Sequence, residues 1–247
     1  MKKLLLISTL LFFACSSDDS DDNISNNYKL VDTINFIWTD TDNEPPNRNE
    51  INATYNYNGN KLSNITFDEV IVNYLYNNNN QISGIYHSTG DSWEAEYDNQ
   101  GRIKTLTYTD VNEDFPSDPP DVSVQNFNYN QNGSVTRTIQ GQNGTTTFLF
   151  DQKGNVTSII HPSNEELYYT YDNKNNPFKN ILGNTFYINF LISFYGLPGL
   201  ENNVITAENE NNRIFYTYDS DDYPINFNSP NGFNSWRNIQ ATITYTN

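Results

Sequence analysis

The most regular feature of the sequence is a pair of aromatic residues two positions apart, followed by Asn or Asp. In a seventh copy, Ala95-Glu96-Tyr97-Asp98, alanine replaces the first ring. The second rings at 129, 150 and 171 are 21 residues apart, so the repeating unit has about 21 residues. The six complete copies are Tyr55-Asn56-Tyr57-Asn58, Tyr74-Leu75-Tyr76-Asn77, Phe127-Asn128-Tyr129-Asn130, Phe148-Leu149-Phe150-Asp151, Tyr169-Thr170-Tyr171-Asp172 and Tyr216-Thr217-Tyr218-Asp219.

Each unit has the pattern of a β-hairpin. Residues two apart lie on one face of a strand, and the Asp or Asn that follows can start a turn. Four residues after the second ring stands a residue that tolerates positive φ, and an apolar return strand comes next. These turn residues are Gly101, Gly133, Gly154, Asn80, Asn175 and Asp222, and the apolar positions include Ile82, Ile103, Val135 and Val156. The pattern predicts an all-β antiparallel meander.

Two insertions interrupt the repeat. Residues 110–121 contain Pro116, Pro119 and Pro120 and predict an extended acidic loop. Within the longer insertion, 182–208, the segment 184–196 is apolar on more than one helical face. We expect it to form a short buried helix, with a pair of core strands as the alternative. Residues 239–245 alternate and predict a closing strand.

The turn sequences carry a family resemblance. Tyr97-Asp98-Asn99-Gln100-Gly101-Arg102-Ile103 resembles the YD repeat of RHS and teneurin proteins, and Asp151-Gln152-Lys153-Gly154-Asn155-Val156 is a looser copy. The resemblance implies a strip of β-hairpins, and about seven units suit a curved sheet or small barrel. Similar repeats occur in surface lipoproteins of Bacteroidetes, which this chain resembles from end to end. The motif implies no particular chemistry.

The first residues predict export. Lys2 and Lys3 precede an apolar run, 4–13, that is too short to span a bilayer, so residues 1–14 read as a signal peptide. Ala14-Cys15 resembles the lipobox of bacterial lipoproteins, which implies lipid attachment at Cys15 and anchoring to a membrane. Phe12 stands where that family usually has Leu. The alternative is an ordinary secretory signal with an incidental cysteine.

The segment after the cysteine predicts a flexible tether. Residues 15–27 contain four aspartates, at 18, 19, 21 and 22, and the run 16–23 has nothing apolar to bury, so the folded domain should span 28–247. The segment resembles the acidic export signal of Bacteroidetes surface lipoproteins. It implies an outer-membrane lipoprotein that faces outward, with the periplasmic face as the alternative.

Composition narrows the classes of partner. The net charge of −17 argues against a basic surface for nucleic acid. Cys15 is the single cysteine, so using it as an anchor would leave the domain without thiol chemistry. The aromatic content of 15% argues against disorder, because so many rings need a core.

No catalytic constellation is evident, and we expect no cofactor. Neither His87 nor His161 lies near a Gly-x-Ser-x-Gly nucleophile elbow, and we expect both at the ends of hairpins. The acids nearest the aromatic strands, which a glycosidase would need as a pair, are Glu94, Glu96, Glu165 and Glu166. Weak calcium candidates are Asp40, Asp42 and Glu44, with a second acidic turn at 219–222. Trp93 and Trp236 fall outside the repeat positions and are candidate ligand contacts for a glycan or protein.

These features favour a non-enzymatic, membrane-anchored surface lipoprotein that acts as a binding or adhesion module. The alternatives are a structural subunit of a cell-envelope complex and a carbohydrate-active enzyme. The enzyme would need two carboxylates converging in a cleft.

Overall fold

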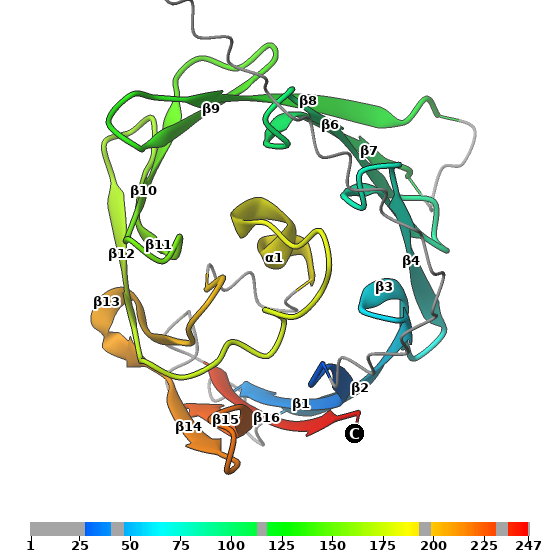
Figure 1. Ribbon diagram of the computed structural model, residues 1–247, viewed down its shortest axis with the longest axis vertical. Helices are drawn as coiled ribbons and strands as arrows, with labels where there is room; N and C mark the ends of the chain where they lie inside the picture. Colours follow the sequence, from blue (N-terminus) through cyan, green and yellow to red (C-terminus); the bar gives the residue numbers. More distant parts are fainter. Residues whose placement is uncertain (1–27, 41–46, 113–117, 193–198, 231–236, 247) are drawn as a thin grey trace, which may run out of the picture.

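The computed structural model describes residues 28–40, 47–112, 118–192, 199–230 and 237–246, which form a single antiparallel sheet and one helix (Figure 1). The predicted all-β meander is confirmed. The elements are β1 Val31–Asp40, β2 Asn47–Asn58, β3 Lys61–Phe67, β4 Val70–Tyr76, β5 Ile82–His87, β6 Ser92–Tyr97, β7 Ile103–Asp110, β8 Asp121–Tyr129, β9 Val135–Ile139, β10 Thr146–Phe150, β11 Val156–Ile160, β12 Glu166–Tyr171, α1 Phe186–Ile192, β13 Val204–Arg213, β14 Phe215–Tyr218, β15 Pro224–Ser229 and β16 Arg237–Tyr245.

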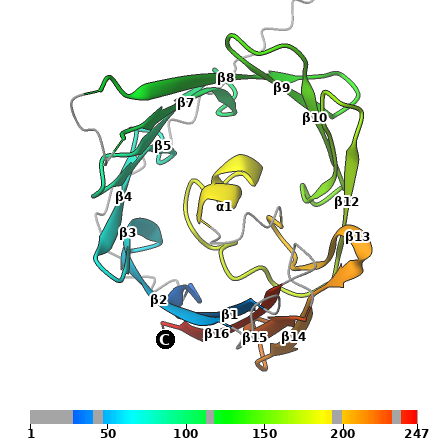
Figure 2. The same cartoon turned by 180° about the vertical axis from the view of Figure 1, so that it is seen from behind.

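The sheet curls into a nearly closed ring. Each strand pairs with its neighbour in sequence from β1 to β13 and from β14 to β16, and β1 also pairs with β16. The two sheet edges, β13 and β14, are consecutive in the chain and lie side by side (Figures 1 and 2). Ile214 N–H donates to the Ile205 carbonyl at 3.0 Å across this seam. The sequence predicts either a curved sheet or a small barrel, and the observed sheet is close to a barrel.

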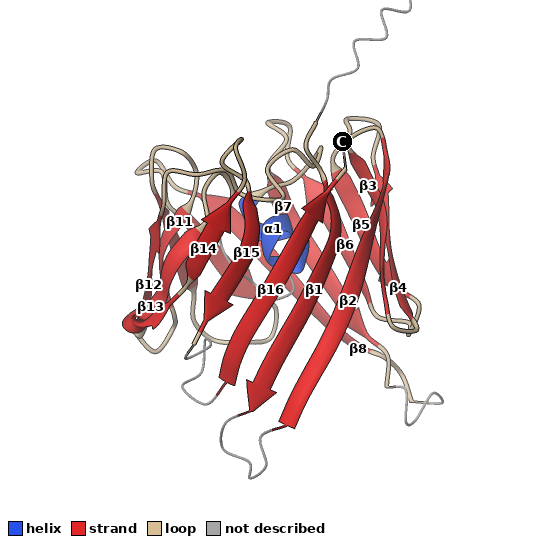
Figure 3. Ribbon diagram, turned by 90° about the horizontal axis from the view of Figure 1, so that it is seen from below, coloured by secondary structure: helices blue, strands red, loops and turns tan. Residues whose placement is uncertain are grey.

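The side chains of the wall alternate between a buried inner face and a solvent-exposed outer face. In β2, Ala53 and Tyr55 are buried, whereas Thr54 and Asn56 are exposed. The same period of two recurs in β4, β8 and β16, so the inner face supplies the core and Asn and Thr cover much of the outside. Figure 3 shows the strands tilted around this core.

The predicted buried helix is confirmed as α1, which lies inside the ring (Figure 1). Ile188 and Ile192 are each 1% exposed. The ring of Phe186 lies 5.4 Å from that of Phe148, and the ring of Tyr187 lies 5.0 Å from that of Phe127. The helix therefore completes the core that the strands surround. No helix among the described residues has the length and apolar character needed to cross a bilayer.

The repeat turns close as the sequence predicts. Positive φ occurs at five of the six predicted turn residues, Asn80, Gly101, Gly133, Gly154 and Asp222. In the Asp98 turn, Oδ1 accepts the N–H groups of Gln100 (2.9 Å) and Arg102 (3.0 Å). Asn77, Asp151 and Asp219 accept from the residues two and four positions later in the same way.

In four of the units, the hydroxyl of the second ring joins the unit to the one before it. Tyr97 donates to the Ile82 carbonyl and Tyr129 donates to the Ile103 carbonyl, at 2.5 and 3.1 Å. Tyr171 donates to Val156 and Tyr245 donates to Pro224 in the same manner. In each case the acceptor is the first residue of the preceding return strand. The second ring of the repeat is therefore both a core residue and a link between units.

The structure contains an eighth unit that the predicted seven omit. Tyr245 pairs with Val31, as Tyr97 pairs with Ile103, and Thr246 N–H donates to the Leu30 carbonyl at 2.8 Å. The N-terminal strand β1 is thus the return strand of a hairpin that β16 begins. Ile243 and Tyr245, two apart, were the available signal in the sequence.

The sixth unit is split, and the prediction of a local turn at Asn175 is wrong. Asn175 is absent from the positive-φ residues, and the chain leaves the sheet after Tyr171. Asp172 Oδ1 accepts the N–H groups of Lys174 (3.0 Å) and Asn203 (3.1 Å), so Asn203 takes the fourth turn position. The return strand is β13, with Val204 paired to Tyr171. The segment between them, residues 173–202, is called the insert below.

Candidate functional site

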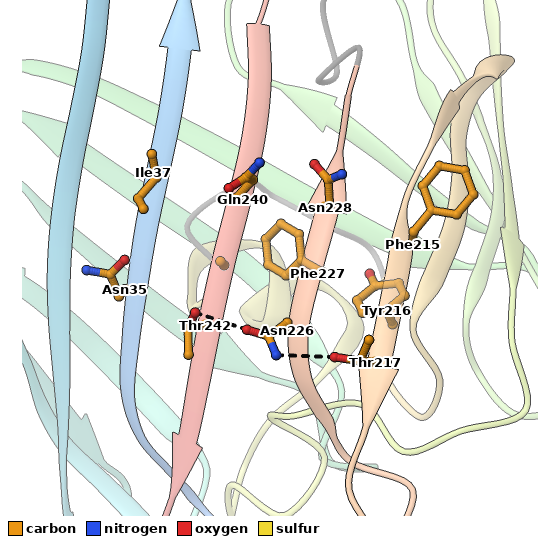
Figure 4. Close-up of a pocket in the computed structure, with 11 residues that line it drawn as sticks. Asn35, Ile37, Phe215, Tyr216, Thr217, Asn226, Phe227, Asn228, Gln240 and Thr242 are labelled. Atoms are coloured by element: carbon orange, nitrogen blue, oxygen red, sulfur yellow. Dashed lines mark hydrogen bonds between the residues drawn. The ribbon is translucent and has the colours of Figure 1, made fainter.

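A groove of about 300 Å³ crosses the outer face of β14, β15, β16 and β1 (Figure 4). Antiparallel register aligns its outward side chains in two rows that run across these four strands. The bonded row is Thr217, Asn226, Thr242 and Asn35. The open row is Phe215, Asn228, Gln240 and Ile37.

The side chains of the bonded row form hydrogen bonds to one another. Asn226 Nδ2 donates to Thr217 Oγ1 at 3.2 Å, and Thr242 Oγ1 donates to Asn226 Oδ1 at 3.0 Å. At the end of the row, Asn35 Nδ2 donates to Asn52 Oδ1 and Glu50 Oε1 on β2. Most of the hydrogen-bonding capacity of this row is used within the sheet.

The open row differs, because its amides have no protein partners. The side chains of Asn228 and Gln240 form no hydrogen bond to any described residue, and Asn228 Oδ1 is buried without a partner. The two amides are direct cross-strand neighbours. Phe215, 56% exposed, pairs with Asn228 at one end, and Ile37 pairs with Gln240 at the other. The row thus presents a ring, two bifunctional amides and an aliphatic side chain.

Core aromatics support the groove from beneath. Tyr216 and Phe227 face the interior with ring centroids 5.9 Å apart, and Phe36 lies 6.1 Å from Phe227. Burial raises the pKa of Tyr216 far above its ordinary value, so its phenol stays neutral and donates to the Val204 carbonyl at 2.9 Å. The packed rings hold β14 and β15 in place below the two rows.

The groove lining carries no charged side chain. The lining residues are Asn35, Ile37, Phe215, Tyr216, Thr217, Asn226, Phe227, Asn228, Gln240, Ala241 and Thr242. The groove is therefore uncharged, although the chain as a whole has 30 acidic and 13 basic residues. A ligand would therefore be recognised here through hydrogen bonds and apolar contacts, not through charge.

A second hollow, about 610 Å³, is acidic and lies where β5–β6 and β7–β8 connect. Asp91 is bonded within the protein: its Oδ1 accepts the Val111 N–H at 2.9 Å. Asp110, Asp118 and Asp121 share the lining. The described residues contain no cluster of three or more His, Cys, Asp or Glu arranged to hold a metal ion.

The acids considered for glycoside hydrolysis lie on the outer wall and in a turn. Glu94 and Glu96 point outward from β6, and Tyr86 donates to Glu94 at 2.8 Å. Glu166 on β12 accepts from Ser158 and Tyr168, both at 2.5 Å, and these bonds lower its pKa. Glu165 lies in the β11–β12 turn. The two pairs occupy strands far apart in the sheet order.

The two histidines occupy hairpin ends. His87 is the last residue of β5 and is half-buried; burial lowers its pKa, although Asp91 opposes the shift. The His161 N–H donates to the Glu165 carbonyl at 2.8 Å and closes the β11–β12 turn. Neither position is near the groove residues in the sheet order.

Trp93, a candidate ligand contact, lies on the inner face and stacks on Tyr108 with ring centroids 4.1 Å apart. Asp40 ends β1, where the structure describes only the backbone. The remaining candidates, Cys15, Asp42, Glu44 and Trp236, lie outside the described residues. In the 219–222 turn, the second calcium candidate, Lys29 Nζ lies 2.5 Å from Asp219 Oδ2 and 2.9 Å from Asp221 Oδ2.

Sequence reasoning did not find Phe215, Asn228 and Gln240. The first is the residue before a repeat ring, and the other two are ordinary outward residues of alternating strands. The signal that could have found Phe215 is its place beside Tyr216, since adjacent aromatics on a strand point to opposite faces. The cross-strand row itself depends on register, which the sequence does not contain.

Comparison with known proteins identifies the fold and a family. No curated protein matches the chain. Among solved structures, the matches include the crystal structure of a porin-like protein from Bacteroides uniformis ATCC 8492, with a TM-score of 0.52 and 12% sequence identity over 87% of this chain and 98% of that one. At that identity the likeness concerns the fold alone. The teneurin YD-shell family matches residues 42–191, which is more than half of the sequence. Together with the Asx-closed turns and the ring pairs of each hairpin, this match means that the chain belongs to the teneurin YD-shell family.

Proposed function

We propose that this chain is a non-enzymatic binding protein, held at a bacterial outer membrane by lipid on Cys15 and displayed outward. The observation that carries the proposal is the open row. Two adjacent amides without protein partners stand beside an exposed ring in a neutral hollow. Asn228 Oδ1 is a buried polar atom, and buried polar atoms are normally paired within a protein, so an unpaired one at a groove favours a bound partner.

The placement of the carboxylates favours binding over catalysis. A glycosidase holds two carboxyl groups about 5–10 Å apart across the bond that it cleaves. Glu94 and Glu96 lie on the exposed outer face of β6 and line neither of the two hollows described above, and Glu166 is bonded to Ser158 and Tyr168. The hydrogen bonds that lower the pKa of Glu166 also make it a poorer general acid.

The arrangement of the chain ends supports a lipid anchor. Leu30 and Thr246 are hydrogen-bonded at the end of the ring that carries the repeat turns. A tether from Cys15 would enter at that end and leave the side wall with the groove open to solvent.

Anchoring is tested with the full chain expressed in a bacterium that processes lipoproteins. We expect incorporation of labelled fatty acid into the wild type and its loss in Cys15→Ala. External protease should cleave the wild type on intact cells. Labelling of Cys15→Ala would refute the anchor, and protection until the cells are broken would refute outward display.

Binding without turnover is tested on the purified full chain. We expect retention of an immobilised glycan or protein from a defined panel, with the ligand recovered chemically unchanged. Cleavage of a retained ligand would contradict the non-enzymatic assignment. Failure to retain any member of the panel would contradict the binding role.

A further inference from the structure

The open row has the composition of a site for hydroxyl-rich ligands. A primary amide offers two donors and one acceptor, and a hydroxyl offers one donor and an acceptor, so neighbouring amides and hydroxyls can satisfy each other in both directions. Asn228 and Gln240 are cross-strand partners. Cross-strand side chains begin about 5 Å apart, a spacing that suits adjacent hydroxyls of one sugar ring.

Phe215 supplies the other half of such a site. Its ring is 56% exposed, although β14 packs Tyr216 into the core directly beside it. An aromatic face exposed beside polar groups is suited to the C–H face of a pyranose. Figure 4 shows Phe215, Asn228, Gln240 and Ile37 side by side on four successive strands. A ligand lying across the strands would meet the ring, then both amides, then the aliphatic end of the row.

Charge and backbone pairing narrow the class further. The lining has no cation for a carboxylated or sulfated ligand, and the net charge of −17 repels polyanions. A peptide that binds by adding a strand needs a free sheet edge, but β1, β15 and β16 are hydrogen-bonded on both sides, and the edge strand of the groove, β14, has β13 beside it (Figures 1 and 2). These observations favour an uncharged carbohydrate over a peptide.

We propose that the open row of Phe215, Asn228, Gln240 and Ile37 is a subsite for an uncharged carbohydrate, with the ring as the stacking platform and the two amides as the hydroxyl-binding groups. This assignment rests on the proposed binding function and names its ligand class.

The test measures binding of the full chain to laminarin, xyloglucan and mannan, with polygalacturonate as the acidic counterpart and denatured casein as the peptide source. We expect binding to at least one neutral polysaccharide and none to polygalacturonate. Phe215→Ala and Asn228→Ala should each raise Kd about tenfold, as the loss of one contact of either kind implies. Phe215→Trp should retain binding and change its fluorescence when the glycan is added.

Two matched controls separate a binding role from a structural one. Tyr168→Ala removes a ring that is also 56% exposed but lies on β12, and should leave Kd unchanged. Asn226→Ala removes an amide from the bonded row and should have a much smaller effect than Asn228→Ala. Equal losses in Asn226→Ala and Asn228→Ala would overturn the assignment to the open row.

The remaining outcomes separate this inference from the proposed function. Glycan binding that ignores all groove variants would overturn the site and leave the binding function standing. Retention of casein alone, abolished by Phe215→Ala, would overturn the carbohydrate class while supporting a binding groove. Retention of none of the five ligands would overturn the inference, and the wider panel described above would then decide the binding function.

Discussion

The Asp151 turn and the Asp172 turn use the same hydrogen bonds, although one is continuous and the other is split. In the first, Asp151 Oδ1 accepts the Asn155 N–H at 2.9 Å and Oδ2 accepts Asn155 Nδ2 at 2.8 Å. In the second, Asp172 makes both bonds to Asn203, each at 3.1 Å. The repeat turn is therefore defined by the partners of the aspartate, and the number of residues between them can vary.

The split turn also changes what its continuous neighbour does. Asn155 Oδ1 accepts three successive N–H groups at the end of the insert, from Leu200, Glu201 and Asn202, at 2.9–3.2 Å. Asn155 is completely buried, and its Nδ2 also donates to Asn202. The insert thus enters the ring at the split Asp172 turn. The neighbouring Asp151 turn binds the end of the insert, where the chain returns to the sheet, through Asn155.

The strongest way to break this comparison is to close the split turn. Replacing residues 173–202 by Asn-Gln-Gly, the residues between Asp98 and Arg102, would make a continuous Asp172 turn. The change removes buried Phe178, Ile181, Phe186, Tyr187, Ile188 and Ile192. At about 1.5–3 kcal/mol for each buried side chain, the loss is on the order of 10 kcal/mol, comparable with total stability.

We therefore expect the closed-turn variant to keep a β-type circular dichroism spectrum, to bind a hydrophobic dye and to lose its cooperative thermal transition. A cooperative transition near that of the wild type would mean that the insert does not support the core.

Asn155→Leu should have the next largest effect. The substitution leaves three N–H groups of the insert without an acceptor, one buried and two part-buried, and each buried group left unpaired costs about 1–3 kcal/mol. We expect about 4 kcal/mol lower free energy of unfolding in urea denaturation, allowing for partial relaxation. Asn73→Leu, on the exposed face of β4, is the control and should change stability by less than about 0.5 kcal/mol. Similar losses in the two variants would show that Asn155 is not a clamp.

Asp172→Ala and Asp98→Ala compare a split turn with a continuous one. Asp172 accepts two bonds from Asn203, one from Lys174 and one from the Tyr218 hydroxyl, so it joins the insert and the seam between β13 and β14. We expect Asp172→Ala to cost about 3 kcal/mol. Asp98→Ala should cost clearly less, because its turn is continuous and its partners, Gln100 and Arg102, belong to the same hairpin. Thermal unfolding of both variants provides the measurement, and the reverse order would contradict the comparison.

The smallest expected effect concerns the tyrosine links that both kinds of turn share. Burial raises the pKa of Tyr76 and of Tyr129 to about 12. The unfolded phenols ionise near pH 10, so their contribution to stability is complete below pH 10 and is lost as the pH rises from 10 to 12. We expect the melting temperature to fall over that window and to fall less in Tyr129→Phe. A melting temperature unchanged up to pH 12 would contradict this account.

Much of the fold could be predicted, because the determinants of each hairpin are local. Ring pairs two apart and a turn residue four positions later predict a hairpin from within one unit, and five of the six turn residues have positive φ. The split unit could not be predicted in this way, because the partner of Asp172 is Asn203, far along the chain. A proline at the start of a return strand does not distinguish a split unit from a regular one, since Pro224 begins β15 in a regular unit.

The groove depends on register between strands from opposite ends of the sequence, such as Ile37 and Gln240. Periodicity predicts which face a residue occupies but not its neighbour across the sheet. The open row could therefore not be predicted from the sequence, whereas the inward direction of Tyr216 and Phe227 follows from alternation.

The pairing of β1 with β16 bears on the order of events during folding. Thr33 and Thr244, hydrogen-bonded at 2.7 Å, are separated by 211 positions in the chain. The ring cannot close until the last strand is available, and until then β1 and the growing end both present unpaired strand edges. Contacts of such long range slow folding, and free edges invite aggregation. A chain emerging N-terminus first would thus need its edges shielded until synthesis is complete.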